Sequence, residues 1–255
     1  MPAPHIVFDI ETVLDKDAVA RAHKLDPNDA EAIRAAIGEE FPKVAYHQIV
    51  AIAATALTYD VDKREWSVLD MASLDAGRFR ERELVSRFVD YVDCMRPVLV
   101  GYNSVAFDVP VVRARAMIHK LRAAHLVEYR AHRYRERHLD LCDALVGRGR
   151  GRLTLDEAAR IFDVGAKTEG MDGGKVDDLA ARGNYSAIAD YCLDDVVATA
   201  GLFLLHETLS GRLDDAGFQR DLGKLRTSRV KTLKERPGSF IHQRAGFLAG
   251  PRLID

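Results

Sequence analysis

Apolar and polar positions alternate with two different periods along this chain, and the short apolar runs predict the strands of a sheet. The run at residues 6–8 is entirely apolar, which is typical of a strand buried on both faces. A long apolar run at 48–59 is followed by a polar turn and a shorter run at 65–69, so these segments predict a hairpin. Residues 98–101 predict a further strand, and 138–145 predict a short strand that leads into a helix.

Longer segments carry their apolar residues at helical spacing. Thr154 followed by Glu157 has the sequence of a capping box, and Asn184 is suited to begin a long helix. The predicted helices cover residues 16–41 (in two pieces), 81–95, 110–126, 155–162, 184–209 and 213–234. Because strands and helices alternate, the predicted fold class is α/β, with a central mixed β-sheet flanked by helices on both faces.

Composition limits the kind of protein this is. Of its 255 residues, 47% are hydrophobic, enough for one large core, and the length permits one domain or two. The net charge is only −2, but Arg and Lys dominate two segments, 113–152 and 212–252, while the remainder is acidic. An acidic centre with basic flanks suits a phosphate-bearing substrate held over metal ions, although solvated helix faces would give similar counts.

Cysteine usage and hydropathy indicate where the protein works. The three cysteines lie far apart with no CxxC spacing, so they predict neither a disulfide framework nor a zinc site, and they suit a reducing compartment. The N-terminal residues do not have the pattern of a signal peptide, and no apolar segment reaches the roughly 20 residues that span a bilayer. We therefore expect a cytoplasmic protein with no membrane partner.

The first candidate for chemistry is the acidic pair at the end of the first apolar run. Asp9 and Glu11 are two residues apart, so on a strand they project from the same face. Two neighbouring carboxylates repel each other unless a cation lies between them. Oxygen-only ligands favour Mg²⁺ or Mn²⁺ over zinc. Such pairs also occur on exposed edge strands, but the apolar residues before Asp9 favour a buried strand and a metal site.

A second block follows the predicted strand at 98–101. Asn103 comes at the end of that strand, and Phe107 and Asp108 come at the start of the next predicted helix. The free N–H groups and the dipole of a helix N-terminus favour an anion there, so Asp108 is a second candidate ligand. The alternative is that Asp108 or Ser104 simply caps the helix.

The third block lies inside the long predicted helix at 184–209. Tyr191 and Asp195 are four residues apart and therefore share one face of the helix, whereas we expect Asp190 and Asp194 to be solvated. Taken separately, Tyr191 could be a core aromatic residue and Asp195 a surface acid. Taken together, the three blocks predict a metal-dependent nuclease, because each one places an acid at or within a buried element.

These three blocks resemble the Exo I, Exo II and Exo III motifs of the DEDD (DnaQ-like) superfamily of 3′–5′ exonucleases. Tyr191, four residues before Asp195, places the resemblance in the DEDDy branch. More narrowly, the chain is similar to stand-alone bacterial proteins related to the proofreading exonuclease domain of family B DNA polymerases. The resemblance covers about residues 4–210 and implies a ribonuclease H-like fold. We therefore expect an exonuclease domain at 1–210, with a C-terminal helical extension and irregular tail at 211–255 packed on it.

The resemblance also implies a mechanism with two divalent metal ions, Mg²⁺ or Mn²⁺, about 4 Å apart. Asp9 would bridge both ions, Glu11 and Asp195 would complete the site of the ion that activates water, and Asp108 would hold the other. Tyr191 would orient the attacking water rather than act as a strong base, since an unperturbed phenol has a pKa of about 10. The product would be a nucleoside 5′-monophosphate released from a 3′ end.

The expected partner is the 3′ end of single-stranded nucleic acid, with DNA favoured over RNA. By resemblance, Asn103 and Phe107 would contact the terminal nucleotide. Lys167 would contact the substrate too, although the residues before it are Gly165 and Ala166 where the family usually has Pro-Gly. Two alternatives stay open: a 3′–5′ exoribonuclease, whose distinguishing contact to the 2′-hydroxyl the sequence does not reveal, and a non-catalytic nucleic-acid-binding module.

Overall fold

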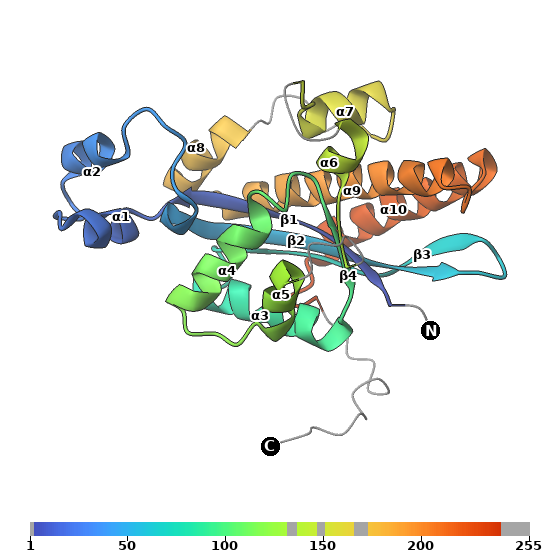
Figure 1. The fold of residues 1–255 in the computed structure, drawn as a ribbon, viewed down its shortest axis with the longest axis horizontal. Helices are drawn as coiled ribbons and strands as arrows, with labels where there is room; N and C mark the ends of the chain where they lie inside the picture. The colour runs from blue at the N-terminus through green and yellow to red at the C-terminus, as the bar shows by residue number, and fades with distance from the viewer. Residues whose placement is uncertain (1–2, 132–136, 147–150, 166–172, 241–255) are drawn as a thin grey trace, which may run out of the picture.

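A five-stranded mixed sheet forms the centre of the structure (Figure 1). The computed structural model describes residues 3–131, 137–146, 151–165 and 173–240. The strand order is β3-β2-β1-β4-β5; β2 is antiparallel to both of its neighbours, and β1, β4 and β5 are parallel to one another. The strands are β1 (His5–Leu14), β2 (His47–Asp60), β3 (Glu65–Asp75), β4 (Val98–Gly101) and β5 (His138–Asp140). The predicted hairpin is therefore confirmed.

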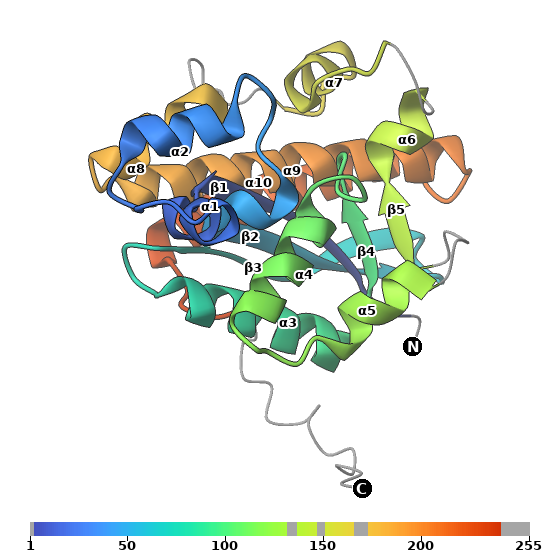
Figure 2. The ribbon, with the colours of Figure 1, turned by 60° about the vertical axis from the view of Figure 1, so that its left-hand side comes forward.

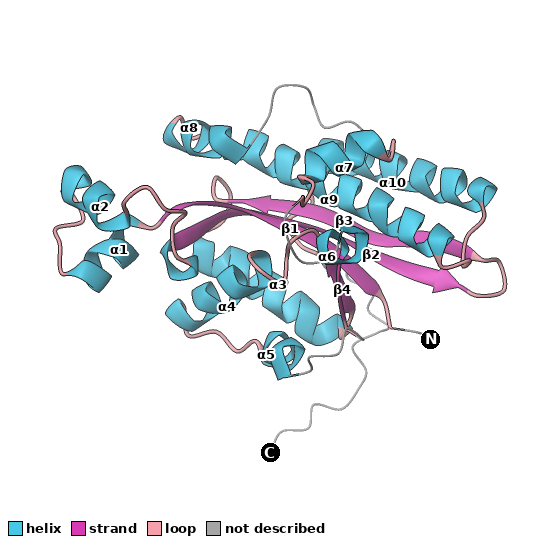
Figure 3. Ribbon diagram, turned by 45° about the horizontal axis from the view of Figure 1, so that its top comes forward, coloured by secondary structure: helices cyan, strands magenta, loops and turns pink. Residues whose placement is uncertain are grey.

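Helices cover both faces of this sheet, as the alternation of elements predicted. One face carries α3 (Glu81–Met95), α4 (Asp108–Ile118) and α5 (Ala124–Ala131), and the other carries α9 (Tyr185–Leu209) and α10 (Asp215–Glu235) (Figure 3). The remaining helices are α1 (Lys16–His23), α2 (Ala30–Ile37), α6 (Leu141–Val146), α7 (Leu155–Ile161) and α8 (Val176–Ala181), with 3₁₀ turns η1 (Val44–Tyr46) and η2 (Gly173–Lys175).

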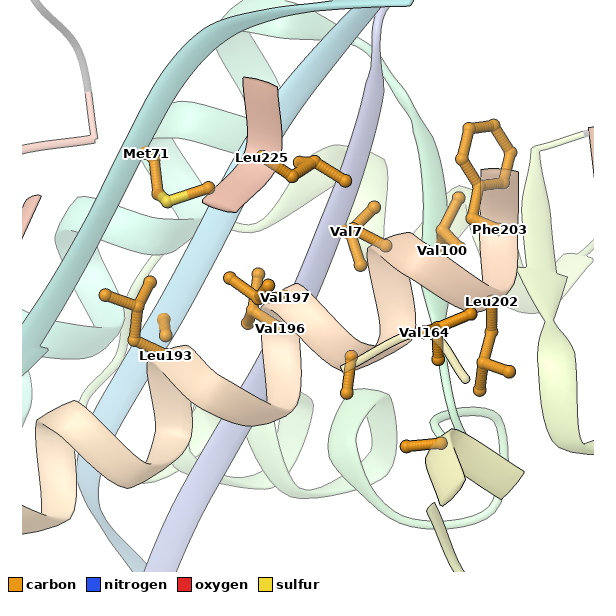
Figure 4. Close-up of a cluster of buried hydrophobic side chains, with 14 of the residues drawn as sticks. Val7, Met71, Val100, Val164, Leu193, Val196, Val197, Leu202, Phe203 and Leu225 are labelled. Carbon is orange, nitrogen blue, oxygen red and sulfur yellow. The ribbon is translucent and has the colours of Figure 1, made fainter. Parts of the chain in front are cut away.

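Side chains of β1 alternate between the two layers of the core. Ile6, Phe8 and Ile10 pack with the buried residues of α3 and α4. Val7 points to the opposite face and packs with the apolar side chains of α9 and α10, among them Val196 (Figure 4). By the same alternation, the next two side chains on the α9 face of β1 belong to Asp9 and Glu11, so the strand passes directly from core to polar residues on that face.

Helix boundaries follow local capping signals where the sequence supplies them. Thr154 and Glu157 form the predicted capping box of α7, and the side chain of Asn184 accepts a hydrogen bond from the amide of Ala187 at the start of α9. One prediction was wrong: residues 110–126 do not form a single helix. The chain turns between α4 and α5, with Lys120 at a φ of 54°, in the left-handed region.

The C-terminal part of the described chain lies against the same sheet. Helix α10 packs on α9 and on β3, and Trp66 donates a backbone hydrogen bond to the carboxylate of Asp221 on α10 (2.8 Å). Helices α1 and α2 form a small separate layer with its own apolar contacts, around Val19 and Ile33. Among the helices that the structure describes, none is long and apolar enough to cross a membrane.

Candidate metal centre

Three carboxylates from β1 and α9 gather where the two elements meet. Asp9 and Glu11 lie on the face of β1 that α9 covers, because side chains alternate along a strand. Asp195 reaches the same place from α9, and one carboxylate oxygen from each of the three acids lies within 4.8 Å of the others. Asp195 is buried, while Asp9 and Glu11 are half-buried. The structure thus brings together acids from the first and third sequence blocks.

The surroundings of Asp9 disfavour a negative charge. Burial raises its pKa well above the ordinary value, and the neighbouring charges of Asp108, Asp195 and Glu11 raise the pKa further. The thiol of Cys192 acts weakly in the other direction, because its Sγ lies 3.3 Å from the backbone oxygen of Asp9 and 3.5 Å from Oδ2. A hard divalent cation would relieve the repulsion, and these carboxylate oxygens are the ligands that Mg²⁺ and Mn²⁺ prefer.

Asp108 lies beside this cluster at the first residue of α4. Burial raises its pKa to about 7, although hydrogen bonds from the backbone amides of Asp108 itself and of Ile10 favour its charged form. The bond to Ile10 ties Asp108 to β1 between Asp9 and Glu11. The charge of Asp108 raises the pKa of Asp9, so Asp108 from the second sequence block belongs to the same electrostatic site. Within the described part of the chain, however, the carboxylate oxygens that lie within 4.8 Å of one another belong to Asp9, Glu11 and Asp195.

The loop between β4 and α4 is shaped by a close approach and by an acid from β5. A Cβ atom on Gly101 would lie 2.3 Å from Oγ of Ser104, so only glycine fits where the strand ends. Asn103 adopts a φ of 60°, and the carboxylate of Asp140 accepts hydrogen bonds from the amides of Asn103 (2.9 Å) and Val105 (3.0 Å). The loop therefore has a fixed shape.

Two predicted substrate contacts come from this loop. The side-chain oxygen of Asn103 is buried and has no hydrogen-bond partner in the described part of the chain, so it can accept a hydrogen bond from a ligand. Phe107 is half-buried and immediately precedes Asp108. The third predicted contact, Lys167, lies outside the described residues. Asn103 and Phe107 thus belong to the loop that leads into Asp108 at the start of α4.

Helix α9 supplies Tyr191 one turn before Asp195, and both side chains are buried. The expectation of solvated acids was wrong for Asp194, whereas the side chain of Asp190 is partly exposed to solvent. Asp194 is buried, and its Oδ1 lies 2.5 Å from Nε of Arg229, while half-buried Asp190 pairs with Arg236 at 2.8 Å. Both arginines come from α10 or its C-terminal end. Helical spacing predicted that Asp195 shares a face of α9 with Tyr191. It could not predict which residues pack against the other face of the helix.

Two residues near the centre had no predicted role. Asp140 fixes the loop that carries Asn103, and Cys192 contacts the carboxylate of Asp9. A signal for Asp140 was present in the sequence, because it follows an apolar residue at the end of a predicted strand, as Asp9 does. Nothing comparable marked Cys192, since a single cysteine in a helical pattern is more often a small core residue.

Comparison with known proteins places these features in context. A family model described as "Predicted 3'-5' exonuclease related to the exonuclease domain of PolB" matches residues 39–243. This range includes Asp108, Tyr191 and Asp195 but begins after Asp9 and Glu11, which the fold brings to the same place. The match confirms the expected relation to that exonuclease domain. A comparison with curated protein sequences gives no match.

A solved structure shows the same fold. It is the family B DNA polymerase from the hyperthermophilic archaeon Pyrobaculum calidifontis, with a TM-score of 0.51 and 21% sequence identity over 92% of this chain. The chain spans 29% of the length of that polymerase. Together with the mixed five-stranded sheet between helices, the likeness bears out the expected ribonuclease H-like fold.

Proposed function

The chain belongs to a family of predicted 3′–5′ exonucleases related to the exonuclease domain of PolB, and we propose that it hydrolyses phosphodiester bonds at the 3′ ends of single-stranded DNA. The products would be nucleoside 5′-monophosphates. We assign this activity to residues 1–210, with 211–255 as an extension whose helix α10 packs on α9 and β3. The three free cysteines suit a reducing compartment such as the cytoplasm.

The observation that carries the proposal is the convergence of Asp9, Glu11 and Asp195 within 4.8 Å, beside buried Asp108. Four carboxylates in one place fit two divalent cations, Mg²⁺ or Mn²⁺, better than one, because each acid adds a negative charge that needs compensation. Asp9, Glu11, Asp108 and Asp195 would hold these ions. When bound, such ions lower the pKa of water and stabilise negative charge on the scissile phosphate and the leaving oxygen.

The remaining residues would orient the reactants. Tyr191 is buried one helical turn from Asp195, so its hydroxyl can orient the attacking water beside that acid. The buried side-chain oxygen of Asn103 would accept a hydrogen bond from the terminal nucleotide, and Phe107 would offer its ring to the base. Because Asp140 fixes the loop of Asn103, these contacts would form with little loss of conformational freedom.

The test is digestion of matched single-stranded DNA and RNA oligonucleotides, labelled at the 5′ end, with Mg²⁺, Mn²⁺ or EDTA. We expect a metal-dependent ladder of shortened DNA, slower shortening of RNA, and nucleoside 5′-monophosphates as products. Asp195→Asn should remove the ladder without unfolding the protein. Faster shortening of RNA would replace DNA with RNA as the substrate, and intact oligonucleotides under every condition would overturn the proposal.

A further inference from the structure

Three aromatic rings form a continuous group next to the candidate metal centre. Phe41 stacks on His47, with ring centroids 5.1 Å apart and an angle of 28° between the planes. Phe107 meets both rings edge-on, at 4.9 Å from His47 and 5.6 Å from Phe41. The group joins the segment between α2 and β2 to the start of α4, and Figure 2 shows that segment passing beside α4. These contacts hold the three rings as one surface.

Hydrogen bonds fix His47 at the centre of this group. Its Nδ1 lies 3.0 Å from the hydroxyl of Thr12, and its Nε2 lies 3.1 Å from the backbone oxygen of Pro42. Burial lowers the pKa of His47, so the ring is neutral near pH 7, with Nε2–H donating to Pro42 and Nδ1 accepting from Thr12. Thr12 follows Glu11 on β1, so this ring is anchored one residue from the acid cluster.

Phe41 is the outer ring of the group and the exposed one. Its side chain is 73% exposed, while Phe107 is half-buried and His47 is buried. An exposed phenylalanine held by stacking on a fixed ring gains little from burial, and it presents a flat aromatic face to solvent. The adjacent Glu39 and Glu40 are exposed acids that repel phosphate, so the part of a nucleic acid that suits this ring is an uncharged base.

We infer that Phe41, supported by His47 and Phe107, is a stacking site for a second nucleobase of the single strand, upstream of the one that Phe107 contacts. This inference rests on the proposed function, because it uses the acid cluster as the place where the 3′ end lies. Phe107 immediately precedes Asp108, and Phe41 is the most exposed of the three rings. A strand that enters from solvent would therefore meet Phe41 before its last nucleotide reaches Phe107. Aromatic stacking accepts any base, so the site would add affinity without sequence preference.

The experiment measures binding separately from cleavage. In an Asp9→Asn background with Mg²⁺, fluorescence anisotropy gives the affinity for a 5′-labelled single-stranded 12-mer that carries one abasic position, moved stepwise through the four nucleotides nearest the 3′ end. We expect Phe41→Ala to weaken binding of the intact oligonucleotide about tenfold. One abasic position should weaken binding of the parent by a similar factor and have little further effect on the Phe41→Ala variant.

Matched variants separate stacking from general effects. Phe41→Trp should keep the affinity and Phe41→Leu should not, because only the first preserves an aromatic face. Phe162→Ala removes another exposed phenylalanine (39% exposed), which follows the last residue of α7 and is not part of the aromatic group, and this variant should bind like the parent. Equal affinity of the Phe41→Ala variant and the parent, or an unchanged abasic profile, would overturn the inference. So would a change in oligomeric state alone, which would assign Phe41 to contacts between copies.

A small substrate distinguishes failure of this inference from failure of the proposed function. The p-nitrophenyl ester of thymidine 5′-monophosphate has no upstream base, so wild type and Phe41→Ala should cleave it at the same rate. On oligonucleotides, Phe41→Ala should raise KM about tenfold and leave kcat nearly unchanged. Equal losses on both substrates would make Phe41 a structural residue and overturn the inference. If wild type cleaves neither substrate, the proposed function fails, while the abasic profile still decides whether Phe41 stacks on a base.

Discussion

The acids on the two sides of α9 have opposite electrostatic surroundings. On the side that faces α10, Asp194 lies 2.5 Å from Arg229, and Asp190 pairs with Arg236. On the side that faces β1, Asp195 lies among Asp9 and Glu11. Asp194 and Asp195 are neighbours in sequence and similarly buried. What differs is the charge of the groups that the fold places around them.

This difference separates acids that are paired within the fold from the acids of the proposed metal centre. A buried carboxylate costs several kcal/mol unless an opposite charge or hydrogen bonds compensate it. The α10 side provides that compensation within the chain, and the hydrogen bond to Asp194, together with its charge, correspondingly raises the pKa of Arg229. On the β1 side, burial and then the neighbouring acids raise the pKa of Asp9 instead. A bound cation can compensate like charges that a fold gathers in this way.

Replacing Asp9 should produce the largest effect. Asp9→Asn keeps the shape of the side chain but removes a charge that both proposed metal ions need, so we expect exonuclease activity to fall on the order of 10³-fold or more. Without metal, the same change relieves repulsion in the cluster and should raise the Tm by a few degrees. Steady-state cleavage of single-stranded DNA and thermal unfolding in EDTA measure the two effects. An active variant, or one that is less stable in EDTA, would contradict the assignment.

Metal binding should stabilise the protein through the β1 side alone. A ligand present at 100 times its Kd stabilises the folded state by about 2.7 kcal/mol. We therefore expect Mn²⁺ to raise the Tm of wild type above its value in EDTA, and Asp195→Asn to lose most of this increase. Asp194→Ala, on the other side of α9, should keep the increase in full. Thermal unfolding of the three proteins with and without Mn²⁺ makes the comparison, and equal shifts in all three would place the metal elsewhere.

Removing an acid from the α10 side should affect stability and not catalysis. Asp194→Ala leaves Arg229 without its partner, which should lower the free energy of unfolding by about 2 kcal/mol, since this pair is largely buried. Asp190→Ala is the matched control, because its pair with Arg236 is more exposed and should contribute about 0.5 kcal/mol or less. Urea unfolding and kcat on single-stranded DNA test both variants; lost activity at unchanged stability in Asp194→Ala would reverse the roles of the two sides.

Much of the fold was predictable because its signals are local. The β2–β3 hairpin follows from two apolar runs around a polar turn, and α9 begins at Asn184, whose cap needs only the next three residues. The break between α4 and α5 was not predictable from periodicity, because apolar residues continue across it. There the chain turns at Lys120, whose backbone is in the left-handed region. The sequence pattern around Lys120 does not indicate this conformation.

In the candidate site, too, local features could be predicted from the sequence and contacts between distant segments could not. The spacing of Asp9 and Glu11 and of Tyr191 and Asp195 predicted which side chains share a face, since strand and helix periods decide that. The periodicity of a single element could not predict the partner of Asp194. Arg229 is 35 residues away in sequence and contacts Asp194 only because α10 packs on α9. The same holds for Phe41, whose contact with Phe107 depends on how the segment after α2 lies on the fold.

The pH dependence of stability should also distinguish the two sides. Asp108 has a pKa of about 7 in the folded protein, raised chiefly by burial, against an ordinary value of 3.8. Between these values the folded state keeps a proton that the unfolded state has lost. The free energy of unfolding in EDTA should therefore fall as pH rises from about 4 to about 7, and this contribution should then level off. One such group changes stability by at most about 1.4 kcal/mol for each pH unit.

Asp108→Asn removes this titration, so its profile should be flatter than that of wild type over the same range, whereas Asp190→Ala should run parallel to wild type. Urea unfolding at pH 5, 6, 7 and 8 in EDTA gives the three profiles. Saturating Mn²⁺ should also flatten the wild-type profile, because a bound cation favours the ionised carboxylates and so opposes the raised pKa that causes the slope. Parallel profiles for wild type and Asp108→Asn would mean that Asp108 is already ionised in the metal-free protein. The acid cluster would then be compensated within the chain, as the α10 side is.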